Sequence, residues 1–231
     1  MFNNIATAVL VLSLAACAAR HPRPVAPPQA LSLPSLQALP APGEYRIDSG
    51  ASELRLLVHR AGPLANLGHN HVMVNRALTG VVQIGAGVSA SSLSLRMRAD
   101  DFVIDDAQSR QEEGGDFPGD IPEDAKAGTR RNMLSSAVLN AAEFPEIAVR
   151  STSLTGTLNE LNADLEITAA GHTSRISVPL SLQGDAHHFT AMGLMELRQT
   201  ALGLTPYSLL HGALQVQDAM QLKFKIMVLT N

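Results

Sequence analysis

Most of the chain after residue 44 alternates between apolar and polar residues with a period of two. In the last stretch the apolar residues fall at even positions, and these are Leu214, Val216, Met220, Leu222, Phe224, Ile226 and Val228. Mainly glutamine and lysine occupy the odd positions, and Asp218 is the single polar residue in the apolar row. Because successive side chains of a strand point to opposite faces, this pattern predicts antiparallel strands with one buried and one solvated face.

The same alternation recurs at residues 93–97, 161–167 and 176–182, and short connections such as residues 183–187 join these runs. We therefore predict an all-β fold, an antiparallel barrel of about eight strands. A barrel of that size is just wide enough to be filled by side chains or to hold one small ligand. The side chains expected to line the lumen are Leu54, Leu56, Val58, Leu93, Leu95, Met97, Leu165, Ile176, Val178, Leu180, Leu214, Val216, Met220 and Phe224.

One helical pattern interrupts the strands, within residues 132–144. An i, i+4 stripe predicts one short helix that ends at Pro145, and it consists of Met133, Leu134, Ala137, Val138, Ala141 and Ala142. Residues 100–131 hold ten of the 21 carboxylates. We expect this acidic segment to be a long, solvated crossing between strands, with a cation-binding loop as the alternative.

The N-terminal segment, residues 1–16, carries no charged side chain and is mostly apolar. It is shorter than the roughly 20 residues that span a bilayer and is typical of a secretory signal. The sequence LAAC that ends at Cys17 resembles the lipobox of bacterial lipoproteins, which implies that the Cys17 thiol receives a diacylglycerol. Cys17 is the only cysteine in the chain. Because Ala18 follows it, the Gram-negative sorting rule implies anchoring in the outer membrane, facing the periplasm.

Proline marks the next segment, since residues 17–43 hold seven of the 13 prolines. Such a segment favours an extended spacer of about 3 Å per residue. The predicted organisation is thus a signal peptide at 1–16, a lipidated cysteine and spacer at 17–43, and a barrel domain at 44–231.

Composition excludes several classes of function. A net charge of −4 provides no basic face for nucleic acid, and the aromatic content of 3% with no tryptophan leaves few stacking surfaces. Beyond Cys17 the chain offers no thiol nucleophile, and it contains neither a Gly-x-Ser-x-Gly motif nor a phosphate-binding glycine loop. We therefore predict a binding protein rather than an enzyme.

Several segments resemble the YceI family of lipocalin-like barrels, which bind polyisoprenoid chains. In chain order the similar segments are Tyr45, Ile47 and Asp48 in the opening strand, residues 128–154, the 162–182 hairpin, and residues 196–206 with 214–226. The resemblance covers about residues 44–229. It implies a lipocalin-like barrel and an apolar small-molecule ligand, such as a polyisoprenoid, an isoprenoid quinone or another lipid.

The chain also departs from this family. Ala51 and Ser52 replace its His-Ser pair, and the Asp-Phe of its Arg-x-Asp-Phe-Gly motif is missing after Arg198. His59 lies one residue before the family's histidine, and a slip of one residue turns a side chain to the other face. The polar end of a ligand must therefore be held differently in this chain.

The sequence LGHNHVMV, residues 67–74, contains the main candidate polar residues, His69, Asn70 and His71. The letters HNH also name a nuclease motif, but that enzyme needs a basic surface, which this chain lacks. If a strand begins by Gly68, the two histidines share one face at the barrel rim. There they would hydrogen-bond the head of an apolar ligand. The alternative is a capped loop in which these residues bond to the backbone.

His69 and His71 are also candidate metal ligands. Zinc takes at least three protein ligands, so His59 or His211 would have to join them.

Three functions remain open from the sequence. The first is an envelope lipoprotein whose barrel carries an apolar ligand. The others are a His-based, metal-binding or redox-linked envelope protein and a structural lipoprotein with a filled core. Beyond a bound quinone or lipid no cofactor is predicted, the lipid anchor is the only expected membrane contact, and a homodimer stays open. An apolar cavity would favour the first function, and three convergent histidines the second.

Overall fold

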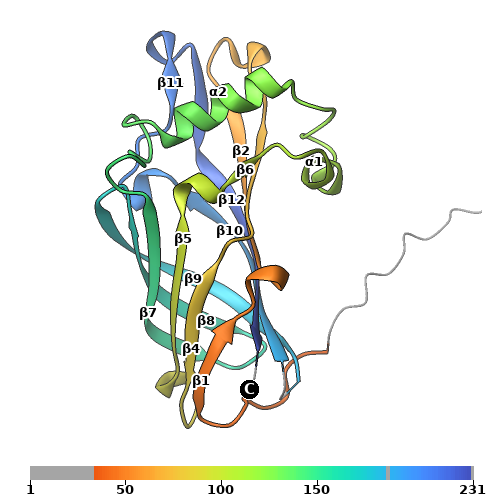
Figure 1. The fold of residues 1–231 in the computed structure, drawn as a ribbon, viewed down its shortest axis with the longest axis vertical. Helices are drawn as coiled ribbons and strands as arrows, with labels where there is room; N and C mark the ends of the chain where they lie inside the picture. Colours follow the sequence, from red (N-terminus) through yellow and green to blue (C-terminus); the bar gives the residue numbers. More distant parts are fainter. Residues whose placement is uncertain (1–33, 186–187, 230–231) are drawn as a thin grey trace, which may run out of the picture. The chain divides into compact units, whose positions relative to one another are not determined.

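Eight antiparallel strands close into a barrel in the computed structural model, which describes residues 34–185 and 188–229 (Figure 1). Their order around the barrel is β1-β4-β5-β7-β8-β9-β10-β12, and β12 pairs back with β1 through Arg46 opposite Leu229. The strands are β1 (Gly43–Ile47), β4 (Thr79–Ile84), β5 (Ser92–Arg98), β7 (Glu146–Gly156), β8 (Leu161–Ala169), β9 (His172–Gly184), β10 (His188–Arg198) and β12 (Leu214–Leu229). The predicted antiparallel barrel is confirmed.

Three further strands extend the sheet beyond β12. They are β2 (Glu53–Ala61), β3 (His71–Asn75) and β6 (Val103–Ile104), and each pairs with the one before it. The short strand β11 (Ser208–Leu209) pairs with the start of β12. β2 continues from β1 after the turn at residues 49–51, and β4 follows β3 after residues 76–78. The extension is therefore built from continuations of barrel strands.

An irregularity in β12 explains the polar residue in its apolar row. Val216 lies opposite Arg60 and Met220 opposite Val58, so β12 uses four steps where β2 uses two. The two extra residues leave the inward parity of the strand unchanged, because side chains alternate with a period of two. Asp218 lies in this irregularity and accepts hydrogen bonds from the Thr200 backbone N–H at 2.9 Å and hydroxyl at 2.8 Å.

Two helices, α1 (Ala107–Glu113) and α2 (Glu123–Leu134), lie where the sequence predicted a solvated crossing. The prediction of a solvated crossing is wrong. The predicted inserted helix is present as α2, but it lies earlier in the chain than residues 132–144. α2 begins after Pro122 and ends at Ser135, whose extended ψ of 166° stops the helix. The apolar residues that follow reach the core through turns, and Leu139 is buried there. None of the helices in the described residues is long and apolar enough to cross a membrane.

The segment containing α1 covers the outer face of β2 and β3. A small second core forms there from Leu57, Val72, Val74 and Phe117. Arg55, on the same face of β2, pairs with Glu112 and Glu113 of α1, each at 2.8 Å. The opposite face of β2 points into the barrel.

Residues 34–42, assigned above to the spacer, pack against the barrel. Leu36 is only 2% exposed, and its backbone N–H donates to Leu182 at 3.0 Å. Gly184 donates to the Pro34 carbonyl at 2.8 Å. This part of the chain therefore belongs to the barrel body. The predictions for residues 1–16, for Cys17 and for the rest of the spacer through residue 33 concern residues outside the described ranges.

Candidate ligand-binding site

Two apolar cavities lie inside the barrel. The larger has a volume of about 210 Å³ and lies under α2, which contributes Met133 to its wall. The smaller has a volume of about 150 Å³, and Leu39 is among its lining residues. The two cavities share a wall made of Leu54, Val149, Ile167 and Leu222. They are therefore neighbouring compartments of one lumen.

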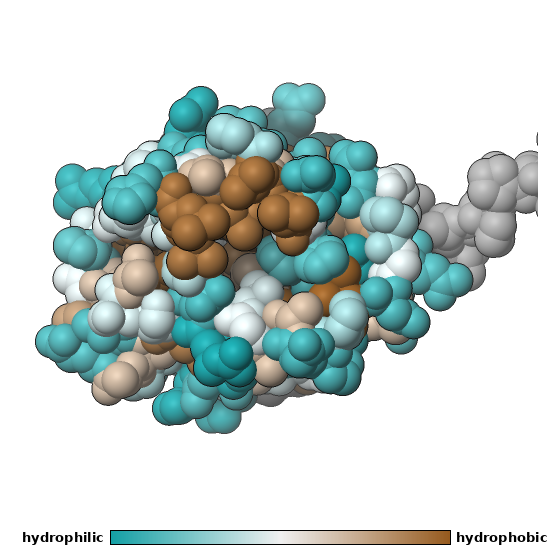
Figure 2. All heavy atoms as spheres, turned by 90° about the horizontal axis from the view of Figure 1, so that it is seen from above, coloured by the Kyte–Doolittle hydropathy of each residue, from teal (hydrophilic) through white to brown (hydrophobic). Residues whose placement is uncertain are grey.

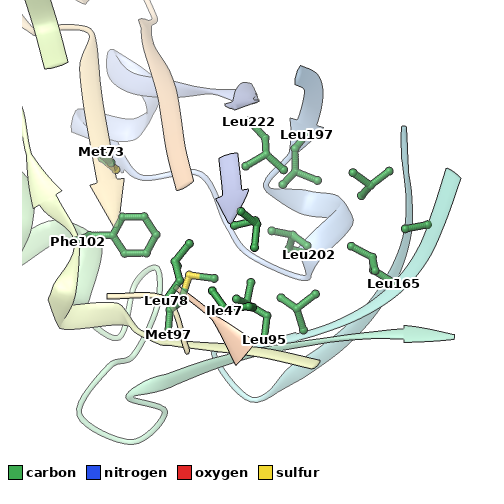
Figure 3. Packing of buried hydrophobic residues seen from close by; sticks show 14 of the residues in the cluster. Ile47, Met73, Leu78, Leu95, Met97, Phe102, Leu165, Leu197, Leu202 and Leu222 are labelled. Carbon is green, nitrogen blue, oxygen red and sulfur yellow. The ribbon is translucent and has the colours of Figure 1, made fainter. Parts of the chain in front are cut away.

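Aliphatic side chains dominate both linings. Figure 3 shows side chains from several elements, among them Phe102, Leu202 and Leu222, pointing into the barrel interior. Of the residues predicted to line the lumen, six line the larger cavity, namely Leu54, Leu56, Val58, Met97, Val216 and Met220. Seven others line the smaller one, namely Leu93, Leu95, Leu165, Ile176, Val178, Leu180 and Phe224. Leu214 lines neither and lies beside Gly68 instead.

The barrel end that carries α2 is also partly apolar at its surface. Seen from above, an apolar patch lies beside a hollow (Figure 2). The loops at this end expose Leu67, Leu209 and Leu210. A hydrogen bond of 2.8 Å from the Leu64 N–H to the Ala213 carbonyl joins the loop before β3 to the loop before β12. Residues of α2 and Tyr207 contribute to the wall of the larger cavity, so the cavity lies next to this end of the molecule.

His71 is the one titratable imidazole in the lining of the larger cavity. Its Nδ1 lies 2.6 Å from Oδ2 of Asp105, whose side chain is fully buried. Oδ1 of Asp105 accepts from the Val72 N–H and from an Arg110 guanidinium nitrogen, each at 2.8 Å. Arg110 is itself buried and also donates to the backbone carbonyl of Asn70 at 2.8 Å. A buried Arg–Asp–His array therefore fixes the ring.

The charge on Asp105 follows from these contacts. Burial alone would raise the pKa of Asp105, because it penalises the charged carboxylate. The hydrogen bonds from His71, Val72 and Arg110 outweigh burial and hold that pKa below its usual value. Asp105 is therefore an ionised acceptor at neutral pH.

The other residues of the LGHNHVMV segment have different positions. β3 begins only at His71, so His69 precedes the strand, is exposed, and does not share a strand face with His71. Asn70 is structural: its Oδ1 accepts from the Arg60 N–H at 3.0 Å and its Nδ2 donates to the Asp116 carbonyl at 2.9 Å. The alternative of backbone bonding thus applies to Asn70, whereas His71 faces the lumen.

The predicted metal site does not assemble. Among residues 34–185 and 188–229, no group of three or more His, Cys, Asp or Glu side chains is placed to hold a metal ion. His59 lies on the outer face of β2, where its ring packs against Phe117 at 5.3 Å between centroids. His71 faces inward on β3, so the sheet separates the two rings. His211 is exposed in a turn with left-handed backbone, φ 56°.

Sequence reasoning missed Asp105 and Arg110. Both lie in the acidic segment that was expected to be solvated, yet helix signals were present there. Asp106 caps α1 by accepting from the Ser109 N–H at 3.0 Å, and Gly114 ends the helix with φ 58°. These capping residues would have indicated a short helix within the segment.

Comparison with known proteins identifies the family to which this architecture belongs. The sequence matches the YceI-like domain family over residues 45–228. The crystal structure of Burkholderia cenocepacia BcnA is similar, with a TM-score of 0.58 and 13% identity, over 78% of this chain and 98% of BcnA. A Campylobacter jejuni YceI protein gives a TM-score of 0.48 and 9% identity, over 67% of this chain and 81% of that one. A search of curated proteins finds no match. The family match spans most of the sequence, and the chain therefore belongs to the YceI-like domain family.

Proposed function

We propose that the barrel binds and carries one apolar molecule, such as a polyisoprenoid, an isoprenoid quinone or another lipid. The observation that carries this proposal is the pair of adjoining cavities, about 210 and 150 Å³ in volume, with aliphatic linings. Ligand pockets are typically concave and apolar, with a few fixed polar groups. Each Å² of apolar surface that a ligand buries there contributes roughly 25 cal/mol. The thirteen predicted lumen residues that line the cavities are its proposed contacts.

A filled structural core is the less favoured alternative. Close-packed protein interiors contain few voids larger than a water molecule, which occupies about 30 Å³ in the liquid. Each cavity is several times that size. A binding role also agrees better with the site than a metal-based role, since no group of three metal-binding side chains forms among the described residues.

The setting that we propose is the bacterial envelope. The support is the apolar segment at 1–16, the LAAC sequence that ends at Cys17 and the proline-rich segment after it. An acylated Cys17 would hold the barrel at the outer membrane, facing the periplasm. A lipid-binding barrel placed there would be within reach of its ligand.

Native mass spectrometry of the full chain, followed by solvent extraction, tests the binding proposal. We expect a bound apolar molecule to accompany the wild-type protein. Ile167 lies in the wall shared by both cavities, so Ile167→Trp places a larger side chain in the space that the ligand would occupy. Overpacking of about 1–3 kcal/mol should weaken binding about 5- to 150-fold.

The matched control is Thr168→Trp, because Thr168 is the next residue of β8 and is exposed. This variant should retain the bound molecule. Wild-type protein that neither co-purifies with an apolar molecule nor takes one up would refute the proposed function.

A further inference from the structure

We infer that the larger cavity selects a ligand whose head group donates a hydrogen bond, such as a phenol, hydroquinone or alcohol, and that Nε2 of His71 is the acceptor. A head that only accepts hydrogen bonds, such as a quinone or an ether, is disfavoured. This inference rests on the proposed function and specifies the head group of its ligand.

The first step is the position of the proton on the ring. Oδ1 of Asp105 accepts from the Val72 N–H and from Arg110, and Oδ2 lies 2.6 Å from Nδ1 of His71. An ionised carboxylate only accepts hydrogen bonds, so Nδ1 must carry the hydrogen. A neutral imidazole has one N–H, and the other nitrogen then has a free lone pair. In neutral His71 that nitrogen is Nε2.

The second step is the surroundings of Nε2. No residue in the described part of the chain makes a hydrogen bond to Nε2, and the His71 side chain is only 12% exposed. The ring lines the cavity together with apolar neighbours such as Val58 and Met73. The charged groups next to it are Asp105 and Arg110, and the exposed ring of His69 lies 6.4 Å away between centroids. A ligand head that covers Nε2 must therefore satisfy its lone pair or leave it unpaired.

The third step concerns the other polar groups of the lining. Thr129 and Tyr207 carry hydroxyls, and Asn132 carries an amide, so each can donate or accept. The amide nitrogen of Gln199 already donates to the Gln217 carbonyl at 2.7 Å, which leaves its oxygen as an acceptor. His71 is thus the lining group whose polarity is fixed by a buried partner. It determines which head group binds better.

Two ligands that differ by one O-methyl group, which removes the donor, test this inference: 4-dodecylphenol and its methyl ether, 4-dodecylanisole. An unpaired buried acceptor costs about 1–3 kcal/mol, so the wild-type protein should bind the phenol about 5- to 150-fold more tightly. Replacing the acceptor in His71→Phe should bring the two dissociation constants to within about twofold. The control His69→Phe changes an exposed ring on the same segment and should keep the wild-type preference.

Asp105→Asn tests the positioning role of the carboxylate. The asparagine amide can donate to Nδ1, which moves the ring proton to Nε2 and turns the acceptor into a donor. The preference for the phenol should disappear in this variant. ¹⁵N NMR of His71 should show the matching change of tautomer, a signal that general loosening of the fold would not produce.

The possible outcomes separate the two proposals. Equal affinity of the wild-type protein for the phenol and the ether overturns the inference and leaves the proposed function intact. An unchanged preference in His71→Phe also overturns it. If the wild-type chain binds neither compound, the proposed function fails and the inference fails with it.

Discussion

At the scale of single residues, Asp105 connects strand β3 to helix α1 through three contacts. Its carboxylate contacts the backbone of β3 at Val72, the ring of His71 and the side chain of Arg110 in α1. Arg110 continues the connection to the carbonyls of Pro118 and Gly119, at 3.0 and 3.1 Å. Removing one partner from such a buried array leaves the others without compensation.

We expect Asp105→Ala to destabilise the protein by about 3–5 kcal/mol at pH 7, the usual cost of breaking a buried ion pair. The folded pKa of Asp105 is lowered, so its contribution is fully present above the unfolded pKa of about 3.9. It is lost as the pH falls through the folded pKa. The difference between wild type and variant should therefore be constant from about pH 7 to 5 and shrink below about pH 4. Denaturant unfolding at each pH measures it.

The control is Asp101→Ala, a change to an exposed carboxylate in the same acidic segment. It should shift stability by no more than about 0.5 kcal/mol. A variant at Asp105 that is as stable as this control would contradict the role assigned to the array.

The array also marks the limit of prediction at this scale. His71 could be chosen from its place in an apolar stretch, but its partner lies 34 residues away in the sequence. A contact of that kind depends on how β3 and β6 pair, which alternation within each strand does not determine. The sequence therefore did not distinguish the buried Asp105 and Arg110 from the exposed charged residues of the same segment.

At the scale of elements, β12 was predictable and the position of α2 was not. The alternation of β12 reflects burial directly, and the two extra residues at its irregularity preserved it. The stripe at residues 133–142 led to a helix prediction at the wrong position, because small and apolar residues at helical spacing can also enter a core through turns. At Ser135 the hydroxyl donates to the Asn132 carbonyl at 2.7 Å, and the chain leaves the helix there.

A pair of lysine substitutions tests the two faces of β12. Leu222 is 7% exposed and lines both cavities, so Leu222→Lys buries an ammonium group without a partner. The cost is at least several kcal/mol, against a total stability of about 5–15 kcal/mol. We expect the variant to lose cooperative thermal unfolding, as followed by circular dichroism.

Gln221→Lys is the matched change on the outer face. Gln221 is exposed and lies opposite Glu196 of β10, so a lysine there meets an opposite charge. Its melting temperature should stay within about 2 °C of wild type. Equal damage from both substitutions would disprove the inward and outward assignment of this strand.

At the scale of the whole molecule, the ordered motifs indicated the family and the strand pattern indicated the barrel. The closure of the barrel through β1 and β12 follows from pairing across most of the chain. The sequence did not predict whether the barrel contains cavities, because the same aliphatic residues can either fill a lumen or line one. Their volumes depend on how those side chains pack together, which composition does not fix.

The proposed anchor is tested on the full chain by Cys17→Ser. Two or more acyl chains give stable membrane binding, so loss of the thiol that would receive them should release the protein into the soluble envelope fraction. Cell fractionation with a salt wash and immunoblotting measures this distribution. Ala18→Asp is the matched control: it keeps Cys17, and by the sorting rule it should move the protein to the inner membrane without releasing it. If the Cys17→Ser protein still sediments with membranes after the wash, the anchor lies elsewhere in the chain, and the barrel does not depend on Cys17 for its place in the envelope.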